Sequence, residues 1–269
     1  MSTRTKVIFW LTAWAIVLMP FLFWRSTWFG RPLSERAVSE YLADSSKPRH
    51  IQHALVQVGE RMARKDASAR QWYPQLVKLA ASPVEEIRNT DAWVMGQDNS
   101  RPEFHQALLL LLKDPSSTVR GNAALSLVRF GDASGRPQLL ALLQPVTLTA
   151  PSAGIVSDAA KPEQTVREGG LVSRIGSIEV RAPSTGRVVS VKPKGAAVSA
   201  GDQLAVLAPP VDQIWEALRA LYLVGTPEDL SVVRSYKRDA PDIPQRIHQQ
   251  AAETERAILE RARVNPPNQ

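Results

Sequence analysis

Hydrophobic and polar positions divide the chain into an apolar N-terminal run, two helical blocks and a β-rich stretch between the blocks. Residues 7–24 read VIFWLTAWAIVLMPFLFW and contain no charge. An α-helix rises about 1.5 Å per residue, so this run would cover roughly 27 Å of a hydrocarbon core that is about 30 Å thick. The pattern predicts a cytoplasmic tail and a transmembrane helix over residues 1–24. Because tryptophan favours the headgroup zone, the expected membrane anchors are Trp10, Trp14, Trp24 and Trp28.

A cleaved secretory signal is the alternative interpretation of this run. The apolar stretch is longer than usual for a signal, and bulky Phe23 and Trp24 stand where cleavage needs small residues. Positive residues are nearly balanced on the two sides of the run, so they leave its orientation open. A short tail before a large body favours a single-pass protein of the bacterial inner membrane with a periplasmic body.

A helical repeat follows a juxtamembrane linker over residues 25–47. Residues 83–115 can be laid over residues 116–145, and a weaker copy precedes them from about residue 48. In the last copy one helical face carries Val119, Ala123, Leu127 and Phe130. A helix pair of this kind buries its apolar side only when neighbouring pairs stack on it. Residues 48–145 resemble HEAT repeats, most clearly in the run VRGNAALSLVRFGD.

Residues 146–210 lose the helical period, and short alternating segments bounded by turn residues predict strands at 177–181, 187–191 and 203–207. The inward-facing residues are expected to be Ile178, Val180, Val189, Val191, Leu204 and Val206. Ala182-Pro183, Gly186-Arg187-Val188 and Gly201-Asp202 resemble the biotinyl/lipoyl-like barrel, in the form used by HlyD-type membrane-fusion proteins. That family presents its modified lysine on a hairpin that corresponds here to residues 173–176. This hairpin reads SRIG, so the resemblance implies a barrel that carries no cofactor.

Helical character returns over residues 211–263, where Gly225 ends one helix and Thr226-Pro227 begins another. Residues 264–269 form a loose tail. The predicted fold class is therefore mainly α, with HEAT-like α–α repeats, an inserted small all-β barrel-sandwich module over residues 146–210, and one N-terminal transmembrane helix.

Composition removes several kinds of chemistry. The chain has 269 residues and no Cys, which excludes disulfides, thiolate metal sites, Fe–S clusters and a cysteine nucleophile. His50 and His53 share a helix face, but no further ligands accompany them, so no metal is expected. Asp91 stands where the matching repeat has Ala123, and a catalytic acid would also need a partner carboxylate and a cleft. We therefore expect no catalytic residue, no metal and no cofactor.

The positive charge is spread thinly, although 33 Lys and Arg outnumber 26 Asp and Glu. Nucleic-acid binding would require denser basic runs with interleaved aromatic residues. Attraction to anionic lipid headgroups or to an acidic protein surface fits better. The candidate interaction surface consists of Arg61, Arg64, Arg174, Arg187, Lys192 and Lys194.

These patterns predict a non-enzymatic, membrane-anchored scaffold, which is an accessory subunit that docks on and stabilises a respiratory, photosynthetic or transport complex of the inner membrane. Its expected partners are integral membrane proteins of that complex and the lipid bilayer, without nucleic acid or a small-molecule substrate. The alternative is a periplasmic adaptor of an efflux or secretion system, although the chain lacks the long coiled-coil hairpin of such adaptors. An enzyme of the HEAT-like bilin lyase type is supported by the repeats alone, and function has to be argued from a site.

Overall fold

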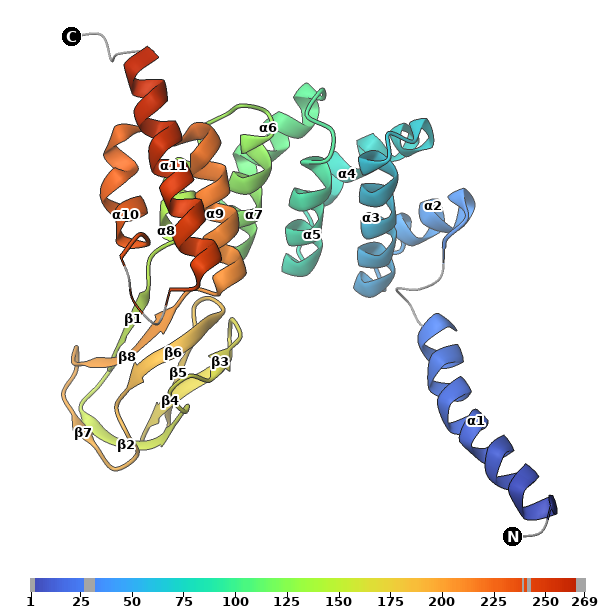
Figure 1. Ribbon diagram of the computed structural model, residues 1–269, viewed down its shortest axis with the longest axis horizontal. Coiled ribbons are helices and arrows are strands. Elements are labelled where there is room, and N and C mark those ends of the chain that lie inside the picture. The colour runs from blue at the N-terminus through green and yellow to red at the C-terminus, as the bar shows by residue number, and fades with distance from the viewer. Residues whose placement is uncertain (1–2, 27–31, 239, 241–242, 265–269) are drawn as a thin grey trace. The chain divides into compact units, whose positions relative to one another are not determined.

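The computed structural model of the protein describes residues 3–26, 32–238, 240 and 243–264. The chain forms two compact units, Met1–Asp98 and Asn99–Gln269. The described residues of the first unit form helices joined by short connections, whereas the second unit combines helices with two β-sheets (Figure 1).

The first unit contains the helical elements α1 (Thr3–Ser26), α2 (Glu35–Ala43), α3 (Pro48–Ala63), η1 (Ala67–Trp72), α4 (Tyr73–Leu79) and α5 (Glu85–Met95). Local sequence sets where they begin: the Ser34 hydroxyl accepts a hydrogen bond from the Ala37 backbone amide, and Pro48 occupies the first turn of α3. α3 packs against α2 and α5. Its buried residues recur at spacings of three and four and include Ile51, Leu55, Val58 and Met62.

The transmembrane prediction is contradicted. α1 is a 24-residue helix with Pro20 inside it, and the predicted anchors Trp10 and Trp14 are exposed. Within the ranges that the structure describes, none of the helices combines the length and the apolar character needed to cross a membrane. We therefore withdraw the spanning segment, the inner-membrane location, the periplasmic body and the anchor roles. Trp24 lies in α1, and Trp28 lies outside the described residues.

The second unit contains the helical elements α6 (Pro102–Leu111), α7 (Ser117–Val128), α8 (Arg136–Ala141), α9 (Val211–Val224), η2 (Pro227–Asp229), α10 (Leu230–Ser235) and α11 (Gln245–Val264). α9 packs against α7 and α8, although about 70 residues of chain separate it from α8. The shared core contains Leu139, Leu143, Leu218, Leu221 and Ile258. The helical stack therefore continues from α8 to α9 across the inserted strands.

A polar contact recurs where one helix pair meets the next. The Tyr73 hydroxyl in α4 donates to Asp98, which follows α5, at 2.7 Å. His105 Nε2 in α6 lies 2.6 Å from a carboxylate oxygen of Asp132, which follows α7. In both cases a side chain from the second helix of one pair contacts an aspartate that follows the first helix of the next pair. The helices are HEAT-like repeats, as the sequence predicts.

Close approach of α7 and α8 depends on Gly135. A Cβ atom at this position would lie 2.7 Å from both the Cα and the Cβ of Ala124. We expect Gly135→Ala to lower the free energy of unfolding by about 2 kcal/mol, because overpacking of a well-packed contact forces the backbone to shift. Urea denaturation followed by circular dichroism measures this loss.

A double-mutant cycle tests the cause of the Gly135→Ala effect. Ala124→Gly should recover part of the loss in the Gly135→Ala background, because it removes the clashing Cβ atom. The control is Gly131→Ala, where no atom lies within 4 Å of the new Cβ and only the positive φ of 73° is unfavourable. Equal coupling of both glycines to Ala124 would contradict the steric explanation.

Eight strands form the β module, which we define as residues 146–208. They are β1 (Val146–Thr149), β2 (Gly154–Ala159), β3 (Thr165–Val166), β4 (Leu171–Ile175), β5 (Ile178–Arg181), β6 (Gly186–Val191), β7 (Ala197–Val198) and β8 (Gln203–Ala208). Their antiparallel pairing gives two four-stranded sheets, in the orders β1-β8-β6-β3 and β5-β4-β2-β7. Two small apolar clusters each take side chains from both sheets, so the sheets pack against each other.

The sequence predicts a barrel-sandwich module, and the barrel part of that prediction is contradicted by this pairing. Each sheet ends in strands that are hydrogen-bonded on one side only, namely β1 and β3 in one sheet and β5 and β7 in the other. No ladder in the described residues connects these edges. The module consists of two packed sheets rather than a continuous barrel.

Candidate functional site

The second unit contains a cleft where its helices meet the β module. Its volume is about 480 Å³, within the range of about 300–1,000 Å³ that is typical of ligand sites. One wall comes from α7 and α8, another from the start of α9, and the third from the 183–185 turn and the end of β8. We call this space the junction cleft.

Contacts between the helices and the β module hold the walls of the junction cleft together. The Ser117 hydroxyl donates to the Pro183 carbonyl at 3.2 Å, and the Thr118 hydroxyl donates to Glu168. On the helical side, Gln213 Nε2 donates to the Leu142 carbonyl at 2.9 Å. Segments that lie far apart in sequence are thereby fixed around one space.

The lining of the junction cleft is mostly apolar and includes several polar side chains. Its apolar lining residues include Leu125, Leu142, Val146 and Leu207. Carboxamide side chains line it at Asn122, Gln138, Gln144 and Gln213. The Oε1 atom of Gln138 is buried and has no hydrogen-bond partner among the described residues. Buried polar atoms are normally paired, so this oxygen suits a ligand that donates a hydrogen bond.

The charged lining residues are Arg120, Asp212 and Glu216. Nη1 of Arg120 donates to the carbonyls of Asp114 and Pro115 at 2.7 and 2.8 Å, so this guanidinium is held by the turn before α7. Asp212 and Glu216 are four residues apart on α9 and are well exposed. Asp212 is ion-paired with Arg246, whereas Glu216 has only a long contact of 4.0 Å with Arg219, so Glu216 is the more weakly paired acid of the α9 wall.

Tyr236, at the end of α10, contacts the residues that follow α8. The Tyr236 hydroxyl donates to the Leu143 carbonyl, and burial raises the pKa of Tyr236 to about 12. In the unfolded chain a tyrosine loses its proton near pH 10. Because the folded protein keeps this proton to higher pH, its stability should fall as the pH rises from 10 to 12.

Tyr236→Phe tests the role of this hydroxyl. It should lower the free energy of unfolding by about 1 kcal/mol at pH 7, because the Leu143 carbonyl loses a donor. It should also flatten the decline of stability between pH 10 and 12, which thermal denaturation at several pH values measures. Tyr222→Phe is the control, since Tyr222 is exposed. An unchanged alkaline slope in Tyr236→Phe would contradict this assignment.

The six residues of the predicted basic surface are divided between the two units of the chain. Arg61 and Arg64 belong to the first unit, whereas the other four residues belong to the β module. Arg61 has a structural contact, because it donates to the Leu33 carbonyl at 2.8 Å and its guanidinium lies 5.0 Å from the centre of the Trp72 ring. Arg64 is exposed and lies 3.9 Å from Glu60.

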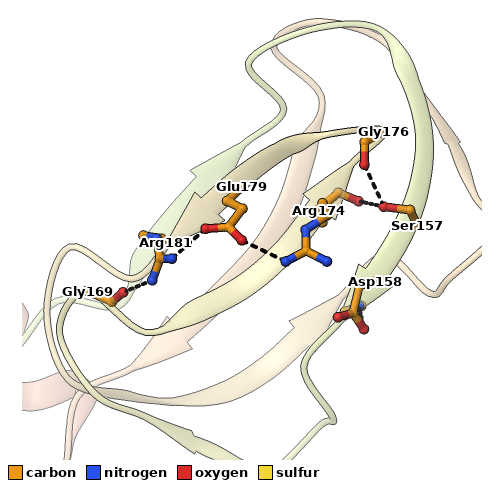
Figure 2. A network of polar contacts seen from close by, with 8 residues as sticks. Ser157, Asp158, Gly169, Arg174, Gly176, Glu179 and Arg181 are labelled. Atoms are coloured by element: carbon orange, nitrogen blue, oxygen red, sulfur yellow. Dashed lines mark hydrogen bonds and ion pairs between the residues drawn. The ribbon is translucent and has the colours of Figure 1, made fainter.

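Arg174 lies in a network on β4 and β5 (Figure 2). Glu179 accepts from Arg174 at 2.6 Å and from Arg181 at 2.5 Å, and Arg181 also donates to the Gly169 carbonyl. Hydrogen bonds from the two arginines lower the pKa of Glu179. Arg174 therefore has its ionic partner within the β module. It lies on β4, the strand that precedes the Gly176-Ser177 turn.

The other three cations of the predicted surface differ in their ionic contacts. Arg187 pairs with Glu163 at 2.5 Å. Lys192 and Lys194 are exposed and form no ion pair within the described residues. None of these residues lines the junction cleft. The proposed interaction role of the six cations stays a prediction.

The two histidines weighed for metal binding have structural contacts, whereas the carboxylate of Asp91 has no hydrogen-bond partner in the described residues. His50 stacks on Tyr41 with 4.1 Å between ring centres, and His53 Nε2 lies 2.9 Å from Gln57 Nε2. Over the described ranges, no three metal-ligating side chains come together. Asp91 is fully buried, neither carboxylate oxygen has a hydrogen-bond partner in the described part of the chain, and burial raises its pKa well above the usual value. It is not in the junction cleft.

Among solved structures, the comparisons give a distant likeness. No family model and no curated protein matches this chain. The solved structure titled the complex of CpcE and CpcF of phycocyanin lyase from Nostoc sp. PCC7120 is similar to it, with a TM-score of 0.46 and 16% identity. The match covers 86% of this chain and 67% of that chain. At this level the likeness carries no argument about what this chain does.

The prediction that the chain is not an enzyme is nevertheless withdrawn. The distantly similar structure is that of a lyase complex, so the absence of an enzymatic activity is not proposed again. A similarity this low assigns no activity in its place, because function has to be argued from a site.

Proposed function

We propose that the chain is a binding subunit that docks on another protein, with the junction cleft as part of its docking surface. The observation that carries the proposal is the cleft itself, which is lined by α7 and α8, by the β module and by the start of α9. Sites of this kind form preferentially where structural modules meet. An accessory role within a larger assembly follows naturally from a subunit of this type.

The proposal omits the membrane complex and the periplasmic adaptor predicted from the sequence, because both required the spanning helix. The resemblance of the β module to lipoyl-type modules enters here as part of the proposal. Its support is the Gly176-Ser177 turn between the paired residues Ile175 and Ile178, a position where a carrier would present its lysine. We take the module to be a docking element without a carried group.

Site-specific photocrosslinking tests the proposed function. A photoreactive residue at Ser184 or Asn122, both in the lining of the junction cleft, should capture the same protein in cells. The same residue at Glu253, which is exposed on α11 outside that lining, should not capture it. The captured protein is then purified to measure direct binding.

A matched pair of substitutions then tests the cleft directly. Ser184→Trp fills the cleft, whereas Ser177→Trp adds the same bulk at the exposed β4–β5 turn. Binding of the purified partner should be lost in Ser184→Trp and retained in Ser177→Trp. Capture of no common protein from the two cleft positions, or equal binding by both tryptophan variants, would overturn the proposal.

A further inference from the structure

We infer that the occupant of the junction cleft is an extended segment of a partner protein that carries an arginine or lysine side chain. This inference rests on the proposed function and specifies the chemistry of the partner. It is drawn from the hydrogen-bonding groups that line the cleft, the charge of Glu216 on α9 and the apolar residues of the lining.

The carboxamide groups match a polypeptide backbone. A carboxamide offers one acceptor and two donors, which is the complement of a peptide unit with its N–H and C=O. Gln138 supplies such a group from the α7–α8 wall. Asn122 and Gln213 also line the cleft, but their side chains already have contacts, that of Gln213 with the Leu142 carbonyl. Because the buried Oε1 of Gln138 has no partner in the described residues, a backbone N–H would satisfy it.

The hydroxyl groups of the β wall extend the same pattern. Ser184 and Thr185 line the cleft on the turn before β6. The helical walls and the β wall therefore both contribute polar groups, and the apolar Leu125 and Leu207 line the same cleft. A segment with alternating side chains can place apolar groups against these leucines while its backbone contacts the polar groups.

Glu216 on the α9 wall favours a basic side chain in the bound segment. Asp212 lies in the first turn of α9 and is ion-paired with Arg246, so its charge is already balanced. Glu216 lies one turn further on, where the effect of the helix dipole has faded, and its ion pair with Arg219 is long, at 4.0 Å. Arg120 is held by the Asp114 and Pro115 carbonyls instead of neutralising this wall. An arginine or lysine of the segment would complement Glu216.

Selection from a phage-displayed library of random linear peptides on the full chain tests the inference. The enriched peptides should share a basic position, and fluorescence anisotropy measures their affinity for variants. We expect at least about tenfold weaker binding to Glu216→Lys, which reverses the charge of the wall. Selection on Glu216→Lys should in turn enrich acidic residues at the same peptide position.

The tryptophan variants locate the binding site of the selected peptides. Ser184→Trp should abolish peptide binding and Ser177→Trp should leave it unchanged. The inference is overturned if no sequence is enriched, if the enriched sequences share no basic position, or if both tryptophan variants bind equally well.

The two experiments fail in distinguishable ways. Crosslinking from Ser184 with no peptide selection would mean that the partner docks through a folded surface, so this inference falls and the proposed function stands. Peptide binding that ignores Ser184→Trp, with no crosslinked partner, would remove both.

Discussion

Replacing Arg136 with alanine should lower the free energy of unfolding by about 3 kcal/mol, because the change leaves a buried carboxylate without its cation. Asp229 has a side chain that is 1% exposed, and its Oδ1 atom lies 3.3 Å from Arg136 Nε. This contact is an ion pair without hydrogen-bond geometry, since the same oxygen has no hydrogen-bond partner in the described residues. We place the loss at the lower end of the range for buried pairs because Arg136 itself is partly exposed.

The Arg136–Asp229 pair connects the helices that precede the β module with those that follow it. Arg136 begins α8, and Asp229 ends η2 after α9, so the pair joins helices on the two sides of the β module. Asp229 also accepts a hydrogen bond from the Thr226 backbone amide at 2.8 Å, which fixes the turn that follows α9. Loss of Arg136 should therefore loosen the connection that restores the helical stack after the insertion.

Urea denaturation of a small set of variants measures the contribution of this pair. Glu228→Ala removes the second, exposed partner of Arg136 and should cost less than about 0.5 kcal/mol. A double-mutant cycle of Arg136→Ala with Asp229→Asn should show coupling, because the two residues are in direct contact. A cost for Arg136→Ala no greater than that for Glu228→Ala would refute the assignment.

The helical repeats could be predicted because the signal lies within short windows of sequence. Val119, Ala123 and Leu127 recur at a spacing of four, and all three are fully buried. Phe130 continues the pattern but is only half-buried, because it lies at the helix end, with its ring centre 5.4 Å from that of His105. Gly225 caps the end of α9, as expected. Local spacing and capping determine these features, so sequence alone reveals them.

The inward face of the strands could not be predicted in the same way. Val189 and Ile178 were expected in the core, but they are 47% and 44% exposed. The buried residues of β6 are Gly186 and Val188, and the pairing of β6 with β8 shifts register between Val188 and Ser190. An irregularity of this kind disrupts the strict alternation on which the prediction depended.

The junction cleft has no signature in the sequence. Its lining runs from Ser117 to Glu216, and the intervening residues include the whole β module. Gln138 and Gln213 have the pattern of an ordinary solvated helix face when each helix is considered alone. Only the contacts of Ser117 with Pro183 and of Gln213 with Leu142 bring these side chains around one space.

Asp91→Ala should stabilise the protein at neutral and alkaline pH, in contrast to most substitutions at buried positions. Burial disfavours the charged carboxylate and raises the pKa of Asp91 well above its usual value. Above about pH 4 the unfolded chain releases this proton while the folded chain keeps it, so wild-type stability falls as the pH rises towards the raised pKa. The slope approaches about 1.4 kcal/mol per pH unit, and Asp91→Ala should remove it.

The matching repeat supplies the reciprocal experiment for Asp91. Ala123, which is fully buried, occupies the position equivalent to Asp91. Ala123→Asp should therefore create the pH dependence that Asp91→Ala removes, and thermal denaturation from pH 4 to pH 9 measures both. At pH 4 the neutral Asp91 carboxyl still lacks hydrogen-bond partners in the described residues, so Asp91→Ala should cost little there. Destabilisation by Asp91→Ala at every pH would instead mean that the carboxyl group has a stabilising partner in solution.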